Sequence, residues 1–309
     1  MTSAISISNL SKNYGKLQVI DNLSLEVPLG SVCGFLGPNG AGKSTTIKIL
    51  VGLSNPTSGS ANINGVPVTK TGLHRRHLGY VAQDPRFYGW MTGREVLEYA
   101  ASYHSNVPKS RIDNLLERVG IADAANRRCS NYSGGMRQRL GIAQALVSKP
   151  AVVILDEPVS AMDPVGRAEI LELMRDLRGE TTVFYSTHIL EDVERLSDYV
   201  AILNRGKLVK TAPTKQLLGS YSKGALKVVL RGANNVITNS LKQIPGINNV
   251  TIAEQHGDVW TYNVQASEEW VMQIQRLITR FAAEQNLTLI RNEPLEMSLE
   301  KIFLQLIEA

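Results

Sequence analysis

The chain has 309 residues, of which 43% are hydrophobic and 20% charged, so it can form one large or two smaller globular domains and is not a disordered chain. No apolar run approaches the ~18 residues that span a bilayer, no secretory signal is present, and two cysteines cannot form a disulfide framework, which predicts a soluble protein of a reducing compartment. The net charge of +5 arises within residues 1–213, where 24 basic and 19 acidic residues form no basic-aromatic stripe, so we expect no nucleic-acid partner.

Residues 1–213 alternate between strand-like and helix-like segments. Short apolar runs, typical of strands buried on both faces, are followed by stretches with helical spacing. The expected strands lie at 31–36, 151–155, 181–185 and 199–203, and the expected helices at 43–51, 167–178 and 189–196. This alternation predicts an α/β fold in which helices cover a largely parallel sheet.

The pattern changes after residues 219–224, a stretch with Gly, Ser and Tyr that is suited to a linker. Beyond it the sequence predicts strands at 225–231, 249–254, 259–265 and 287–290, helices at 236–244 and 270–281, and a closing helix with Ser298 as its N-cap. The order β-α-β-β-α-β is typical of a ferredoxin-like module. We therefore predict two domains, residues 1–218 and a smaller α+β domain of residues 219–309.

The strand predicted at 31–36 is followed by a sequence typical of a phosphate-binding loop. The pattern G-x-x-x-x-G-K-[ST] is matched by Gly37, Pro38, Asn39, Gly40, Ala41, Gly42, Lys43 and Ser44, which lie between a strand-like and a helix-like run. Backbone N–H groups of such a loop cradle phosphate oxygens at the positive end of the helix. Lys43 is suited to reach the β- and γ-phosphates of a nucleotide, Thr45 to contact phosphate, and the Ser44 hydroxyl to ligate Mg²⁺.

Two carboxylates, Asp156 and Glu157, end the apolar run at 152–155. In open α/β sheets ligands collect at the carboxyl ends of the strands, so a nucleotide bound to the phosphate loop would lie near these side chains. Asp156 is suited to hold Mg²⁺, directly or through water, and Glu157 to orient or deprotonate an attacking water. A helix N-cap pair is the alternative interpretation, and the intact phosphate loop favours the catalytic one.

These residues resemble a known family, the nucleotide-binding subunits of ABC transporters. The resemblance covers residues 5–213 and consists of seven motifs in the family's order: an aromatic at Tyr14, the phosphate loop, Gln83 in Tyr-Val-Ala-Gln, the signature around Ser133, Gly134 and Gly135, the pair Asp156–Glu157, the D-loop Ser160-Ala161-Met162-Asp163, and Ser186-Thr187-His188. It implies a P-loop NTPase of the ABC ATPase type, with a RecA-like core, a helical subdomain, and ATP and Mg²⁺ as cofactors.

The resemblance also implies roles for single residues. Tyr14 is expected to stack on adenine, Gln83 to offer its carbonyl oxygen to Mg²⁺ or the water, and His188 to hydrogen-bond the γ-phosphate. The signature at 133–135 precedes a long helical stretch and therefore forms a second anion site at a helix N-terminus. By resemblance this second site faces the γ-phosphate bound to a second copy, so that ATP bridges two subunits.

Four positions depart from the family's pattern. Tyr132 and Met136 replace the leucine and the glutamine of the signature L-S-G-G-Q. Val159 stands where the family usually has Thr or Ser, and Met162 replaces a leucine of the D-loop. Because the Ser-Gly-Gly core remains and no catalytic group is lost, we expect a competent site.

Two segments resemble the branch of the family that serves ABC-2-type exporters of drugs, antibiotics or lipids: the signature and the closing stretch at 294–304. The aromatics Phe87, Tyr88 and Trp90 lie where the family receives the coupling helix of the membrane subunit, and ordinary core packing is an equal alternative for them. The domain at 219–309 is expected to regulate, to stabilise a dimer, or simply to stabilise the chain.

We therefore expect an ATPase subunit that dimerises around two MgATP, with a second copy or a related subunit, and drives a separate transmembrane permease. It would be cytoplasmic and peripheral on the inner face of the cell membrane. A soluble ABC ATPase scaffold without transport is the alternative. An ATPase of translation or DNA repair is disfavoured, because 113 positions separate Lys43 from Asp156, with neither a second cassette nor a coiled-coil insertion.

Overall fold

The computed structural model describes residues 3–105, 107–160, 162–222, 224–295 and 298–308. Two compact units are present, Met1–Thr214 with Leu306–Ala309, and Lys215–Gln305. Helix α7 (Thr214–Ser222) includes residues 219–222, so the linker expected there is wrong for these four residues, and Lys223 lies outside the described residues. The division of the sequence at residues 218 and 219 stays a prediction. Within the described ranges, no helix is long and apolar enough to cross a membrane.

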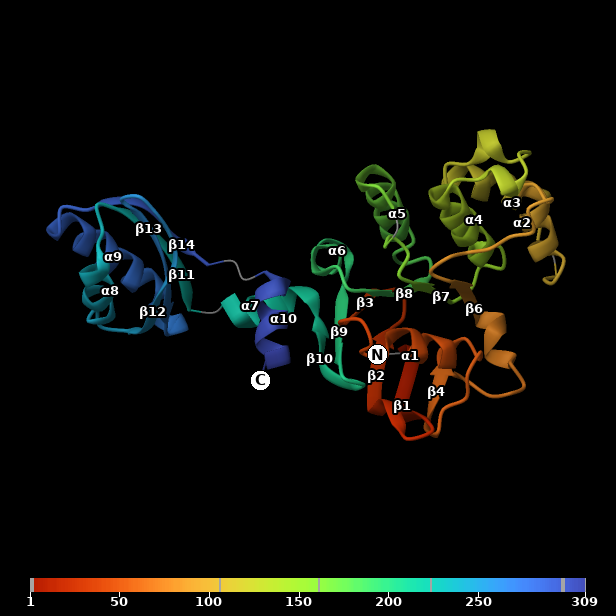
Figure 1. The fold of residues 1–309 in the computed structure, drawn as a ribbon, viewed down its shortest axis with the longest axis horizontal. Helices are drawn as coiled ribbons and strands as arrows, with labels where there is room; N and C mark the ends of the chain where they lie inside the picture. Colours follow the sequence, from red (N-terminus) through yellow and green to blue (C-terminus); the bar gives the residue numbers. More distant parts are fainter. Residues whose placement is uncertain (1–2, 106, 161, 223, 296–297, 309) are drawn as a thin grey trace. The chain divides into compact units, whose positions relative to one another are not determined.

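A six-stranded sheet forms the centre of the larger unit (Figure 1). In spatial order its strands are β10 (Lys207–Pro213), β9 (Tyr199–Asn204), β3 (Val32–Leu36), β8 (Thr182–Thr187), β7 (Val152–Asp156) and β6 (Leu78–Val81). The strands from β9 to β6 are parallel, and β10 pairs antiparallel with β9. Every residue of β3, β7 and β8 is buried, which confirms the prediction of strands covered on both faces.

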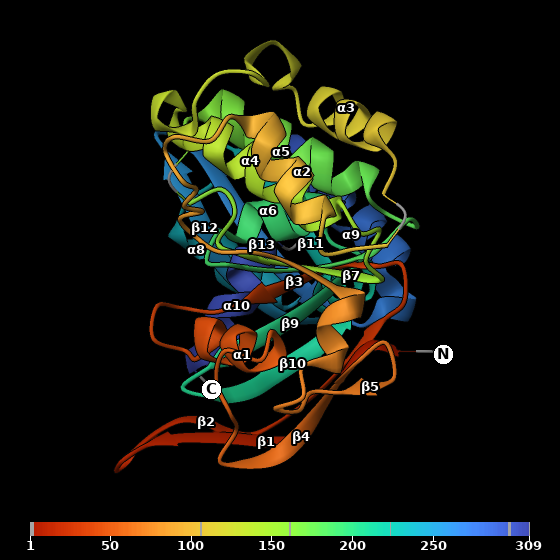
Figure 2. The same ribbon diagram turned by 90° about the vertical axis from the view of Figure 1, so that its right-hand side faces the viewer.

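Helices cover both faces of this sheet (Figures 1 and 2). One face is covered by α4 (Gly134–Leu146), α5 (Pro164–Asp176) and α6 (Leu190–Leu196). The other face is covered by α1 (Lys43–Leu50), behind which lies a second, antiparallel sheet. The order of strands in that second sheet is β2 (Leu17–Pro28), β1 (Ser3–Tyr14), β4 (Ser58–Ile63) and β5 (Val66–Pro67).

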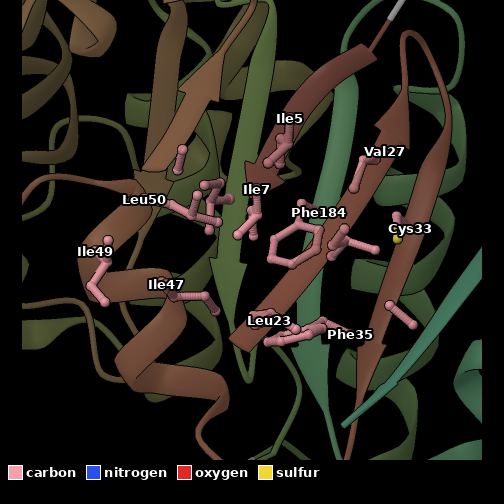
Figure 3. Packing of buried hydrophobic residues seen from close by; sticks show 14 of the residues in the cluster. Ile5, Ile7, Leu23, Val27, Cys33, Phe35, Ile47, Ile49, Leu50 and Phe184 are labelled. Atoms are coloured by element: carbon pink, nitrogen blue, oxygen red, sulfur yellow. The ribbon is translucent and has the colours of Figure 1, made fainter. Parts of the chain in front are cut away.

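The core between the two sheets holds α1, and with it the phosphate loop, in place (Figure 3). Ile47 and Leu50 of α1 belong to one buried cluster with Ile7 of β1 and Phe184 of β8. The rings of Phe35 and Phe184, on neighbouring parallel strands, lie 5.1 Å apart between centroids. Each such side chain stabilises the fold by about 1.5–3 kcal/mol through burial, so the loop is anchored to both sheets.

A group of three helices corresponds to the expected helical subdomain. Helix α2 (Gly93–Ala101) and helix α3 (Lys109–Arg118) pack against each other and against α4. A capping box begins α2, because the Thr92 hydroxyl accepts from the Glu95 N–H and the Glu95 carboxylate accepts from the Thr92 N–H. The apolar stripes that these helices bury include Val96, Leu97, Ile112, Leu115 and Leu116.

The smaller unit is a four-stranded antiparallel sheet with two helices on one face. Its strands are ordered β12 (Ile247–His256), β13 (Val259–Ala266), β11 (Ala225–Arg231) and β14 (Thr288–Pro294). Helices α8 (Asn235–Lys242) and α9 (Val271–Glu284) share one buried cluster with this sheet, around Tyr262 and Leu230. The chain order β-α-β-β-α-β confirms the predicted ferredoxin-like module. A last helix, α10 (Leu299–Glu308), follows.

Replacement of Phe184 by alanine tests the anchoring of α1. Phe184→Ala should lower the free energy of unfolding by about 3–5 kcal/mol, because it removes a fully buried ring and leaves a cavity. Leu53→Ala is the control, since Leu53 is 67% exposed and its loss should change stability by less than about 0.5 kcal/mol. Urea denaturation followed by circular dichroism measures both, and a similar effect of the two variants would contradict the assignment.

Candidate functional site

An open cavity of about 280 Å³ lies at the carboxyl end of the parallel sheet, beside the N-terminus of α1. It brings together most of the residues that the sequence singles out. Its lining consists of Val19, Pro38, Asn39, Gly40, Ala41, Gly42, Lys43, Ser44, Thr45, Gln83, Glu157 and His188. Segments far apart in the sequence therefore meet here, as expected for strands whose carboxyl ends share one edge of a sheet.

The backbone of the loop depends on its glycines. Gly42 precedes α1 with φ +106°, a left-handed conformation that side chains rarely adopt. At Gly37 a Cβ atom would lie 2.4 Å from the carbonyl oxygen of Leu203, so β9 approaches the loop too closely for any other residue. No side chain caps the N-terminus of α1, so the amides at its start are available to an anion.

The Lys43 ammonium is buried within this loop. Its Nζ donates to the carbonyl oxygen of Gly37 at 2.7 Å and to that of Pro38 at 3.3 Å. The same Nζ lies 3.3 Å from Oε1 of Glu157, and both side chains are less than a tenth exposed. An anion that enters the loop competes with Glu157 for this ammonium.

Glu157 connects the loop to the next parallel strand. Its Oε2 lies 2.9 Å from Nδ1 of His188, which follows β8, so the carboxylate joins Lys43 and His188. Its backbone adopts φ +49°, a conformation that a non-glycine residue adopts only at a cost in energy. The surrounding hydrogen bonds hold this strained residue with its carboxylate at the edge of the cavity.

Asp156 lies deeper, where hydroxyl groups orient it. Ser44 Oγ donates to Asp156 Oδ1 at 3.2 Å, and Ser186 Oγ donates to the same oxygen at 2.6 Å. Ser186 Oγ also accepts from the backbone N–H of Glu157 at 2.9 Å. The sequence places Ser186 only in the motif of His188 and assigns it no role. In the structure this one hydroxyl orients the Asp156 carboxylate and holds the backbone of Glu157.

Besides Gly37 and the buried Asp156, two of the expected groups lie outside the cavity lining. Tyr14 is half exposed on the β1–β2 hairpin, and the Lys12 ammonium lies 4.8 Å from its ring centroid. The signature residues Ser133, Gly134 and Gly135 begin α4, where the Ser133 hydroxyl accepts from the Met136 N–H at 3.2 Å. The chain therefore assembles the phosphate loop, both carboxylates, Gln83 and His188 by itself, and presents the signature separately.

The expected D-loop residues precede α5. Asp163 caps this helix and accepts from the N–H groups of Val165 and Gly166. The Gly166 amide contributes most to lowering the pKa of the Asp163 carboxyl. Ala161 lies outside the described residues. Arg167, one turn further, makes a bidentate ion pair with the buried Asp192 of α6 and so ties the helix after the D-loop to the helix after His188.

The aromatic segment that follows Gln83 is exposed. Tyr88 is 64% exposed and Trp90 is 69% exposed, and their rings stack with centroids 5.6 Å apart. Core packing, one of the two alternatives for this segment, is therefore wrong for these two residues, whereas Phe87 is half-buried. An exposed aromatic pair of this kind is available for contact with another protein.

Comparison with known proteins agrees with this geometry. A family model described as "ABC transporter" matches residues 20–160. The bacitracin transport ATP-binding protein BcrA of Bacillus licheniformis is 34% identical over 99% of this chain and 98% of its own length. The uncharacterized ABC transporter ATP-binding protein YxlF of Bacillus subtilis is 44% identical over 66% of this chain and 69% of its own length. A solved structure of an ATP binding subunit of an ABC transporter superposes with a TM-score of 0.65 at 29% identity, covering 71% of this chain and 93% of that chain.

Replacement of Ser186 tests its role in holding the carboxylates. Ser186→Ala should lower the free energy of unfolding by about 1–3 kcal/mol, because the buried Glu157 amide loses its acceptor and Asp156 loses a donor. Ser160→Ala is a matched control that deletes a hydroxyl bonded to the Glu157 carbonyl from an exposed residue, and it should cost less than about 0.5 kcal/mol. Equal urea midpoints for the two variants would refute the assignment.

Proposed function

The chain belongs to the ABC transporter ATP-binding proteins, and from this premise we propose that it powers an exporter whose transmembrane permease is a separate chain. The observation that carries the proposal is the Glu157 carboxylate, which lies between the Lys43 ammonium of the phosphate loop and the His188 imidazole. The similarity to the bacitracin transport protein over nearly the whole of both chains supports export.

The phosphate groups of ATP bind to the loop at 37–45. The amides at the start of α1 point toward them, and the Lys43 ammonium neutralises charge on the β- and γ-phosphates. Tyr14 stacks on the adenine, in a hairpin outside the described lining of the cavity. The base therefore lies away from the loop, while the reacting phosphate lies against it.

The residues present fit a magnesium ion. The Ser44 hydroxyl and the Asp156 carboxylate converge to 3.2 Å, and Gln83 lines the same cavity with its amide. Hydroxyl, carboxylate and amide oxygens are the ligands that Mg²⁺ prefers, usually in company with the phosphates of the substrate. Among the described residues, no group of three His, Cys, Asp or Glu side chains could hold a metal alone, which agrees with a site that the nucleotide completes. When bound, Mg²⁺ supplies charge neutralisation at the phosphates.

Glu157 and His188 carry out the hydrolytic step. Glu157 orients the water and accepts its proton, because its carboxylate lines the cavity within reach of the loop. His188 hydrogen-bonds the γ-phosphate and holds Glu157 through Nδ1. When phosphate oxygens replace Glu157 at Lys43, the carboxylate becomes free to engage the water, so nucleotide binding itself prepares the base.

The signature at 133–135 serves the nucleotide of a second ATPase subunit, either another copy or a related chain. Its Ser133 caps α4, a helix of 13 residues, and lies outside the lining of the cavity built by the same chain. Dimerisation around two ATP molecules supplies each cavity with the signature of the other subunit. The stacked pair of Tyr88 and Trp90 contacts the permease, and the chain acts on the cytoplasmic side of the membrane. We propose no nucleic-acid partner. The domain at 219–309 stabilises or regulates the assembly.

Replacement of the proposed base separates binding from hydrolysis. Glu157→Gln should bind ATP normally and lower the hydrolysis rate by at least about 100-fold, because the amide cannot accept a proton. It should accumulate as an ATP-dependent dimer in size-exclusion chromatography. Glu172→Gln, which changes an exposed carboxylate on α5, should retain full activity. Near-normal steady-state hydrolysis by Glu157→Gln would refute the catalytic role.

Isolation from membranes decides between a transporter and a soluble scaffold. A tagged chain should co-purify with a transmembrane protein after detergent extraction, and Trp90→Ala should weaken this association without affecting ATP binding. Leu53→Ala is the control, since it also removes an exposed apolar side chain of the same unit. If no membrane protein accompanies the unmodified chain, the scaffold is the better description.

A further inference from the structure

Tyr132, immediately before the signature serine, is a buried tyrosine whose hydroxyl group is hydrogen-bonded. Only 4% of it is exposed, and its hydroxyl donates to the carbonyl oxygen of Ala124 at 2.7 Å. Burial raises the pKa of this phenol, so the hydroxyl stays protonated and able to donate. The leucine found at this position in the family has no polar group to satisfy. A buried donor without an acceptor is costly, so the Tyr132 hydroxyl has to stay bonded to the Ala124 carbonyl. This hydrogen bond fixes the residue before Ser133 in a way that a leucine could not.

Gly93, the first residue of α2, fits this phenol. A Cβ atom built on Gly93 would lie 2.2 Å from Oη of Tyr132 and 3.2 Å from Cζ. The phenol therefore occupies the space that any side chain at position 93 would need. The tyrosine and the glycine form a matched pair, since the ring reaches Ala124 only where α2 begins without a side chain.

Backbone hydrogen bonds join the segment that leads into α2, residues 89–94, to the segment that leads to the signature, residues 125–130. The N–H of Cys129 donates to the Met91 carbonyl at 2.8 Å, and the N–H of Ser130 donates to the Gly89 carbonyl at 3.1 Å. Thr92 and Arg128 form an isolated antiparallel bridge. Residues 89–94 and 125–130 are therefore held together by backbone hydrogen bonds. The side-chain contacts of Tyr132 are the last ones that fix this part of the chain before Ser133.

The other side of the signature is also held. The Arg137 guanidinium donates to the carbonyl oxygen of Tyr132 at 2.8 Å, and the Ser133 hydroxyl caps α4. Tyr132 therefore sets the position of Ser133 in two ways: its side chain is bonded to Ala124 and packs against Gly93 of α2, and its carbonyl accepts from Arg137 of α4.

We infer that Tyr132 is a positioning residue for ATP hydrolysis: its hydroxyl bond to Ala124 and its ring against Gly93 hold Ser133 where it meets the nucleotide of the second subunit. This inference rests on the proposed function, because Ser133 acts on the nucleotide bound by another chain. Without the hydroxyl the residues around Ser133 are less ordered. Ordering them when the dimer closes then costs free energy, and the rate of ATP hydrolysis falls.

Tyr132→Phe removes the hydroxyl and keeps the ring. It should lower kcat about threefold to tenfold, the loss that corresponds to one net hydrogen bond. ATP affinity of the isolated subunit should stay unchanged, because the phosphate loop of the same chain is untouched. A fluorescent nucleotide titration measures this affinity, and steady-state hydrolysis measures kcat and KM. Tyr103→Phe is the matched control, since it deletes an exposed hydroxyl on the neighbouring helical surface and should leave kcat unchanged.

A double-mutant cycle tests the matched pair. Gly93→Ala alone should lower kcat, because its Cβ displaces the phenol, and the loss should be smaller in a Tyr132→Leu background, where no phenol is present. Losses at both positions that simply add would overturn the pairing. A kcat of Tyr132→Phe equal to that of the unmodified chain would overturn the inference.

The dimer assay separates this inference from the proposed function. In the Glu157→Gln background, Tyr132→Phe should raise the ATP concentration needed for dimerisation several-fold. If Glu157→Gln itself forms no ATP-dependent dimer, the proposed function fails. If Glu157→Gln dimerises, the added Tyr132→Phe leaves that dimerisation unchanged, and Tyr132→Phe in the otherwise unmodified chain leaves kcat unchanged, only the role of Tyr132 fails.

Discussion

The buried ammonium of Lys43 is the charge on which the site depends. A lysine that is 6% exposed must be compensated, and here two loop carbonyls and the Glu157 carboxylate surround it. The loop carbonyls can face inward only because glycines permit the backbone path, and α1 can begin there only because the core between the two sheets holds it. Loop, helix and carboxylate are therefore parts of one electrostatic arrangement rather than separate motifs.

Local features of this arrangement could be predicted from the sequence, because each depends on residues near one another in the chain. The buried strands lie within two residues of their predicted bounds, since unbroken apolar runs at the centre of a parallel sheet leave little ambiguity. The phosphate loop could also be predicted, because its glycines and lysine are adjacent in the chain and together set the local backbone path. By contrast, residues 219–222 contain Gly and Ser and are nonetheless helical in α7, which shows how weak composition alone is as a guide to a linker.

Features that depend on long-range contacts could not be found in this way. Ser186 lies 30 residues from Asp156 in the chain, and only the pairing of β7 with β8 brings its hydroxyl to the carboxylate. In the sequence Tyr132 is only a replacement for the usual leucine. Its structural role depends on contacts with Gly93 and Ala124, which neither spacing nor periodicity predicts. Exposure of Tyr88 and Trp90 is likewise a property of the folded surface.

In the proposed function, the separation of the signature from the cavity leaves a single chain incomplete as a catalyst. Lys43, Glu157 and His188 assemble within one subunit, whereas Ser133 begins a helix that does not line their cavity. Hydrolysis can then depend on dimerisation without any change in the loop itself, because the missing contact comes from outside. The same separation gives the helical subdomain its importance: residues 89–94 carry the exposed Trp90 and are hydrogen-bonded to the segment that ends at the signature. If the permease binds at Trp90 as proposed, it acts through this connection on the proposed signature contact with the second subunit, and contacts such as that of Tyr132 stiffen the connection.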